Sequence, residues 1–127
     1  AWFVQGDVDR AIADYTEAIR LNPKAASTYN NRGLAYRKKG DADAAIEDFG
    51  RALSINPTFA VAYANRGYAY EAKGLKAEAI GELNRALLLD PSLVGASAAL
   101  RRLGAPGQGR DAVDYGGGKV AGTERGF

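Results

Sequence analysis

Two short acidic segments begin with the spacing of a calcium-binding loop. Asp7-Val8-Asp9 and Asp41-Ala42-Asp43 each place two carboxylates two positions apart. A loop of the EF-hand type also needs Gly at its sixth position and Glu at its twelfth, and neither segment has these residues. A carboxylate can instead accept hydrogen bonds from the free N–H groups at the start of a helix. We therefore predict that Asp7 and Asp41 are helix N-caps.

Other carboxylates that could carry out acid–base chemistry are Glu17, Glu47 and Asp48. Acid–base catalysis needs a carboxyl group whose pKa is tuned by its surroundings, and we expect these three on exposed faces of helices without a catalytic partner. The chain has no His and no Cys, which excludes an imidazole-based triad, a thiol nucleophile and the usual zinc ligands. We predict that the protein is not an enzyme and holds no cofactor and no metal.

The charge balance limits the classes of partner. The 17 basic and 15 acidic residues give a net charge of +2, which is little for a nucleic-acid-binding surface. Arg37-Lys38-Lys39 is a short basic cluster that we interpret as a helix C-terminus, where cations are favourable; a patch for nucleic acid or for an acidic protein is the alternative. The chain has no run of about 18 apolar residues, so we predict no membrane insertion. The sequence indicates no compartment.

The chain repeats itself at a fixed interval, which the even spacing of Pro23, Pro57 and Pro91 marks. The segment 29–36 aligns with the segment 63–70 in the same register, and both contain Asn-Arg-Gly followed by a large residue and Ala-Tyr. A fixed period of this size predicts a solenoid, in which each unit packs on its neighbours.

Each unit is expected to contain two helices. First helices over 26–39 and 60–73 end at Gly40 and Gly74, which suit the left-handed residue that follows many helices. Second helices over 42–55 and 76–89 are stopped by the prolines that follow them.

These helices divide the chain into an array and a tail. We expect the array over residues 1–103, with a partial unit over 1–25, full units over 26–59 and 60–93, and a partial or capping helix over 92–103. Residues 104–127 hold eight of the 16 glycines and little apolar patterning, so we expect a Gly-rich disordered tail there.

The repeated residues resemble the tetratricopeptide repeat (TPR) family, whose helix-turn-helix units have about 34 residues, like the repeats of this chain. The resemblance rests on an aromatic residue, a Gly, a Tyr, an Ala with a large residue four positions later, and a Pro. In one unit these are Tyr29, Gly33, Tyr36, Ala45, Phe49 and Pro57, and in the next Tyr63, Gly67, Tyr70, Ala79, Leu83 and Pro91. It implies an all-α fold, a right-handed α-solenoid of stacked helix-turn-helix units. The sequence departs from the family pattern at Arg32 and Arg66, where the pattern has Leu.

The first helix of each unit has two different faces when it is projected at 100° per residue. Tyr29, Gly33 and Tyr36 share one face, which we expect to be core, with the Gly allowing close helix approach. The opposite face would, by resemblance to TPR arrays, line a concave groove that binds extended segments of other proteins. The candidate partner-binding residues on it are Asn30, Asn31, Leu34, Lys38, Val61, Asn65 and Tyr68.

Two of these candidates, Asn31 and Asn65, occupy equivalent positions in successive units. An amide side chain both donates and accepts hydrogen bonds, which suits the backbone of an extended peptide. The resemblance implies an Asn ladder of the kind that some long TPR superhelices use. The alternative is that both residues are simply exposed to solvent and occur twice only because the repeat was duplicated.

The resemblance also provides a test for one specific function. Chaperone-binding TPR domains hold the C-terminal carboxylate of their partner with Lys, Asn and Arg side chains. Asn31 matches one member of that clamp, but Val61 and Asn65 stand where Lys and Arg are needed. We therefore do not expect a carboxylate clamp.

We predict a non-catalytic scaffold that binds an extended peptide or a partner protein in the concave groove. The alternative is a TPR segment of a larger enzyme or signalling protein whose catalytic region is not in this chain, because Trp2-Phe3-Val4 read as the remainder of a first helix. Self-association through the N-terminal edge is a further possibility, since the helix there lacks its first-helix partner.

Overall fold

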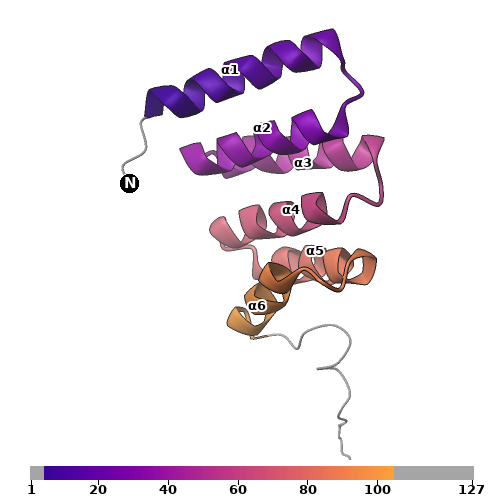
Figure 1. The fold of residues 1–127 in the computed structure, drawn as a ribbon. Helices are drawn as coiled ribbons and strands as arrows, with labels where there is room; N and C mark the ends of the chain where they lie inside the picture. Colours follow the sequence, from indigo (N-terminus) through magenta and orange to yellow (C-terminus); the bar gives the residue numbers. More distant parts are fainter. Residues whose placement is uncertain (1–4, 105–127) are drawn as a thin grey trace, which may run out of the picture.

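The computed structural model describes residues 5–104, which form a stack of six α-helices (Figure 1). They are α1 (Gln5–Leu21), α2 (Ala26–Lys39), α3 (Ala42–Ile55), α4 (Ala60–Ala72), α5 (Lys76–Leu89) and α6 (Val94–Arg102). Each helix packs on the next one along the chain, and α2 also contacts α4. The protein is thus an all-α solenoid. Apart from Gly104, the predicted tail lies outside the described residues, as do residues 1–4.

The helix ends follow from local backbone chemistry. Gly40 and Gly74 have φ angles of 93° and 78°, in the left-handed region that the prediction required. Asp41 caps α3, because its Oδ1 accepts a hydrogen bond from the Ala44 N–H at 3.1 Å. The prediction for Asp7 is wrong: α1 begins at Gln5, so Asp7 lies within its first turn, where a carboxylate still favours the positive helix end.

The loops that carry the three repeat prolines share one turn. Asn22, Asn56 and Asp90 each accept a hydrogen bond from the backbone N–H two positions later, at 3.3, 3.3 and 3.0 Å. This turn holds Ser92 outside the last helix, which therefore starts at Val94 and not at the predicted residue 92. The predicted bounds of α2, α3 and α5 are confirmed, and α4 ends one residue early at Ala72.

Small residues on one helix face a large residue on the next. A Cβ atom at Gly33 would lie 2.5 Å from Cε1 of Phe49, and one at Gly67 would lie 2.9 Å from Cγ of Leu83. Phe49 and Leu83 are fully buried. The predicted core face is therefore confirmed, and glycine is needed at both positions because the space is already filled.

A buried ion pair joins the helices of the second unit. Asp48, which we expected on an exposed face, is 1% exposed and binds Arg32 of α2. That expectation is wrong because the arginine at the unusual position reaches across to α3 and provides the carboxylate with charge and hydrogen bonds. Glu47 and Glu17 are exposed as expected, and they pair with Arg51 and Arg20 on their own helices.

Candidate functional site

Three neighbouring hollows follow one another over helices α1, α2, α4 and α6. The first has a volume of about 330 Å³ between α1 and α2, the second about 270 Å³ on α2, and the third about 660 Å³ between α2, α4 and α6. The first and second hollows share Leu34 and Lys38, and the second and third share Arg37. We call this surface the groove. The first helices of the units form most of its lining. Their core faces are turned toward the second helices, so their opposite faces are open to the groove.

The structure brings four of the predicted residues together in this groove. Asn31, Leu34 and Lys38 line the first hollow, opposite Val8 and Tyr15 of α1, and Tyr68 lines the third. The lining therefore contains amide, apolar and basic side chains. Such a lining can satisfy the backbone and the side chains of an extended peptide together.

The other three predicted residues lie differently. Val61 is 41% exposed on α4 and lines none of the three hollows. Asn30 and Asn65 are buried, and the Asn65 Nδ2 group donates a hydrogen bond to Asn30 Oδ1 at 3.0 Å. The helical projection placed Asn30 on the open face, whereas the structure places it between α2 and α4. Its role in partner binding, like that of the other six, stays a prediction.

Asn31 is exposed although its equivalent, Asn65, is buried. The difference lies in the neighbouring helix: α2 covers Asn65, and among residues 5–104 no helix stands in the same relation to Asn31. Its amide is therefore open to the groove, with no hydrogen bond to any described residue.

Three groove residues that link successive units are not among the predicted partner-binding residues. Arg37 was interpreted from the sequence as part of a helix C-terminus, and Glu71 and Arg102 were missed. The Arg37 guanidinium lies 5.4 Å from the centroid of the Tyr68 ring. Arg102 donates two hydrogen bonds to the Glu71 carboxylate, from Nε at 3.0 Å and from Nη2 at 2.7 Å. Arg37 and Glu71 are equivalent residues, and so are Tyr68 and Arg102, because the members of each pair lie one repeat apart.

Each of these contacts therefore joins the same two positions of consecutive units. Aligning equivalent residues of the repeats does not reveal this contact, because its two partners occupy different positions in the repeat. A search for complementary residues at a spacing slightly shorter than the repeat would have found both contacts.

The charges in the third hollow act on one another. Hydrogen bonding by Arg102 lowers the pKa of Glu71, and burial raises the pKa of the Tyr68 hydroxyl while Arg37 and Arg102 oppose that shift. The hollow thus offers positive charge and hydrogen-bond donors. No group of His, Cys, Asp and Glu side chains within residues 5–104 could hold a metal ion, and no helix there is long and apolar enough to cross a membrane.

Comparisons with known proteins agree with this geometry. Two family models described as tetratricopeptide repeat match residues 26–59 and 49–87, and a third described as TPR repeat matches residues 2–40. None of the curated proteins compared with the chain matches it.

Several solved structures are similar. The first TPR of Spaghetti (RPAP3), bound to the HSP90 peptide SRMEEVD, is 31% identical with a TM-score of 0.75, and the match covers 79% of each chain. The Arabidopsis OM64 TPR domain is 34% identical with a TM-score of 0.75, covering 77% of this chain and 81% of that one. The second TPR domain of human RPAP3, in complex with the HSP70 peptide SGPTIEEVD, is 30% identical with a TM-score of 0.74, covering 78% and 82%.

The matched spans, the register of the repeat and the packing of Gly33 and Gly67 lead to one assignment. The chain belongs to the tetratricopeptide repeat family.

Proposed function

We propose that the protein is a non-catalytic binding module whose groove holds an extended segment of a partner protein. The observation that carries the proposal is that three neighbouring hollows across α1, α2, α4 and α6 share lining residues. Two of the similar TPR domains are bound to chaperone peptides, which supports peptide binding as the use of this surface.

The mode of binding differs from a carboxylate clamp. Val61 stands at the position where the clamp needs Lys, and Asn65, where it needs Arg, is buried against Asn30. The groove instead offers the exposed amide of Asn31 and the apolar side chain of Leu34. The partner segment is therefore recognised along its length and not by its C-terminal carboxylate.

Selection of ligands from a random dodecapeptide library, followed by affinity measurements on single peptides, tests the proposal. Leu34 lines the groove and Leu88 is a leucine on α5 that is 72% exposed. The Leu34→Gln variant should bind the selected peptides about ten-fold more weakly, because an apolar contact is lost. The matched Leu88→Gln variant should bind them like the unaltered chain, and equal losses in both variants would refute the groove as the binding surface.

A second candidate function is self-association through the first hollow. Ala11 and Tyr15 are partly exposed there, whereas their equivalents Ala45 and Phe49 are fully buried in the core cluster that includes Tyr36 of α2. A helix from a second copy could cover the first hollow in the same way. Sedimentation velocity at increasing protein concentration tests this idea. We expect a dimer, and the Tyr15→Ser variant should dimerise more weakly. A monomer at every concentration would contradict the idea.

A further inference from the structure

The first and second helices of the units differ in charge. Among the first helices, α2 has four basic and no acidic residues and α6 has two basic and no acidic residues. Among the second helices, α1 has four acidic and two basic residues and α3 has three acidic and one basic residue. In α4 and α5 the charges balance. The net charge of the whole chain hides this separation, and the groove between α2 and α6 lies in a positive field that attracts an anionic partner.

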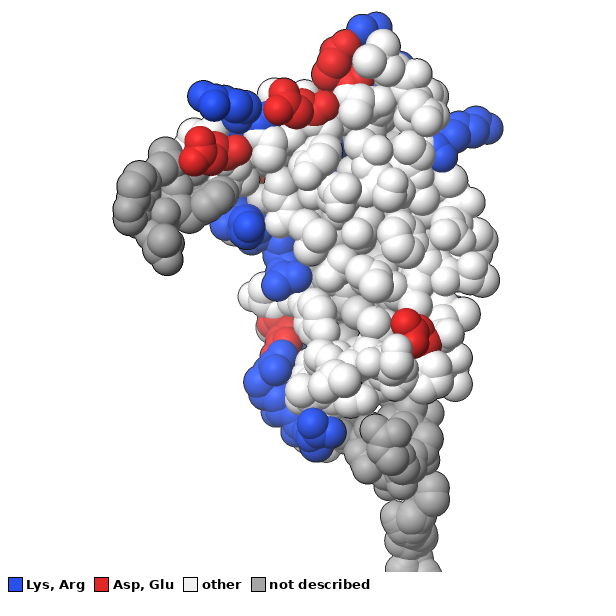
Figure 2. Space-filling view, in the orientation of Figure 1, with Lys and Arg blue, Asp and Glu red and all other residues white. Residues whose placement is uncertain are grey.

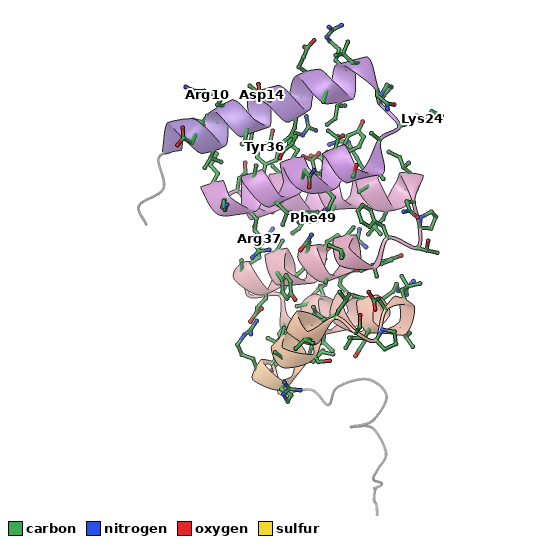
Figure 3. The ribbon with its side chains drawn as sticks, viewed as in Figure 1. Arg10, Asp14, Lys24, Tyr36, Arg37 and Phe49 are labelled. Atoms are coloured by element: carbon green, nitrogen blue, oxygen red, sulfur yellow. The ribbon has the colours of Figure 1, made fainter. Side chains whose placement is uncertain are left out.

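Several basic side chains lie along one edge of the face drawn in Figure 2. Figure 2 shows Lys and Arg in blue along the left edge, below the level of α1, while most of the right side is uncharged. Figure 3 places Arg37 near the C-terminal end of α2, above α4. Arg37 and Arg102 are both lining residues of the third hollow.

Arg37 and Arg102 approach the same tyrosine from two helices. Arg37 makes no ion pair with a described residue and is held against the Tyr68 ring, 5.4 Å from its centroid. On the far side, a Cβ atom at Gly95 would lie 2.9 Å from the Tyr68 hydroxyl oxygen. The absence of a side chain at Gly95 lets this hydroxyl reach α6, where Arg102 pairs with Glu71.

We infer that the third hollow binds a carboxylate side chain of an acidic peptide segment, held by Arg37, Tyr68 and Arg102. This inference rests on the proposed function and names the chemical class of the partner. Arg37 has a guanidinium ready to bind a carboxylate, which arginine holds through two parallel hydrogen bonds. When the peptide binds, Arg102 releases the carboxylate of Glu71 and pairs with the carboxylate of the peptide. The charge of Arg102 therefore has a partner in both states.

The same charges argue for a peptide over a nucleic acid. Glu71 lies in the third hollow and Asp7 in the first, so acidic groups interrupt the positive surface at both ends of the groove. A nucleic acid carries a phosphate on every nucleotide and would meet both of them. An acidic peptide can place its carboxylates at the arginines only.

The test uses two fluorescein-labelled dodecapeptides with amidated C-termini, one with four Glu among Ala and Leu residues and one with Gln at those four positions. Fluorescence anisotropy should show about ten-fold tighter binding of the Glu peptide. The double variant Arg37→Gln/Arg102→Gln should lose this preference. The variant Arg10→Gln/Lys24→Gln removes the same charge from exposed sites on α1 and its following loop (Figure 3) and should keep it.

Two further variants sharpen the experiment. Glu71→Gln should raise the affinity for the Glu peptide several-fold, because it removes the carboxylate that competes for Arg102. Arg37→Gln alone breaks no ion pair with a described residue, so it tests the hollow even where the double variant is less stable.

Equal affinity for the two peptides, or a preference that survives loss of both arginines, would overturn the inference. Tighter binding of a single-stranded dodecanucleotide than of the Glu peptide would also overturn it. If Leu34→Gln weakens the library-selected peptides while the arginine variants change nothing, the acidic subsite fails and the groove function stands. If neither set of variants changes binding, both fail.

Discussion

Arg32 holds the buried carboxylate of Asp48 through two parallel hydrogen bonds, from Nε to Oδ2 at 2.7 Å and from Nη2 to Oδ1 at 2.8 Å. The next unit repeats the pair at the equivalent positions, with Arg66 Nη2 lying 2.9 Å from Glu82 Oε2. The family pattern has Leu at both arginine positions. In this chain a charged contact therefore joins the two helices of each full unit, with the arginine on the first helix and the acid on the second.

Removal of one partner of the buried pair should be costly. Asp48→Ala leaves Arg32, whose side chain is only 14% exposed, without its counter-charge, and we expect the free energy of unfolding to fall by about 3–5 kcal/mol. Urea denaturation followed by circular dichroism measures this change. The neighbouring Glu47, whose side chain is 65% exposed, provides the control: Glu47→Ala should change stability by less than about 1 kcal/mol. Similar losses in both variants would contradict a special role for the pair.

Two Gly-to-Ala substitutions, one on a first helix and one on a second helix, should change the stability of the protein in opposite directions. In Gly33→Ala the new methyl group would lie 2.5 Å from the Phe49 ring, and overpacking of this kind costs about 1–3 kcal/mol. Gly81 lies within α5, and a Cβ atom there meets nothing within 4 Å. Gly81→Ala should therefore stabilise the protein by about 0.5–1 kcal/mol through helix propensity. Thermal unfolding of the two variants under identical conditions measures both changes, and a stabilised Gly33→Ala protein would show that Phe49 can move away.

The repeat made the fold predictable from the sequence. Pro57, Gly40 and Gly33 act through local backbone geometry or through a close contact within one unit, and these effects recur from one unit to the next. The bounds of α6 were less accurate, because the hydrogen bonds from Ser92 to Asp90 compete with the first turn of that helix.

The groove was harder to predict, because its lining depends on contacts between units. Asn31 and Asn65 have the same place in the repeat and different exposure. Within residues 5–104, only Asn65 has the first helix of a preceding unit, α2, packed against it. Asp48 was misplaced for a related reason. A carboxylate is normally exposed, and its burial depends on Arg32, which lies on another helix.

The Asn30–Asn65 contact should couple the first helices of two units. Each single change to Ala leaves the other buried amide without its partner, which costs about 1–3 kcal/mol. The double variant removes both groups, so we expect it to lose less than the sum of the single losses, with a coupling energy of about 1 kcal/mol. Denaturation of the four proteins of this cycle measures it. Asn31→Ala is the control and should leave stability unchanged, because its amide makes no bond to a described residue; additive losses at Asn30 and Asn65 would argue against the hydrogen bond.

The Glu71–Arg102 pair should make the packing of α6 on α4 dependent on pH. Arg102 lowers the pKa of Glu71 below its ordinary value of 4.5, with a smaller contribution from Arg37. A carboxyl group whose pKa is lower in the folded state stabilises that state above its unfolded-state pKa. Its contribution is therefore present at pH 7 and is lost as the pH falls through the lowered value.

Glu71→Gln removes this contribution at every pH. The unaltered chain should have the higher Tm at pH 7, and the difference between the two proteins should shrink as the pH is lowered from 5 to 3. Thermal unfolding across this range, followed by the circular dichroism of the helices, measures the difference. Glu78→Gln is the matched control, because Glu78 is exposed in the first turn of α5 and has no ion pair with a described residue. A gap between the unaltered chain and Glu71→Gln that stays constant down to pH 3 would show that the pair contributes through packing and not through its charge.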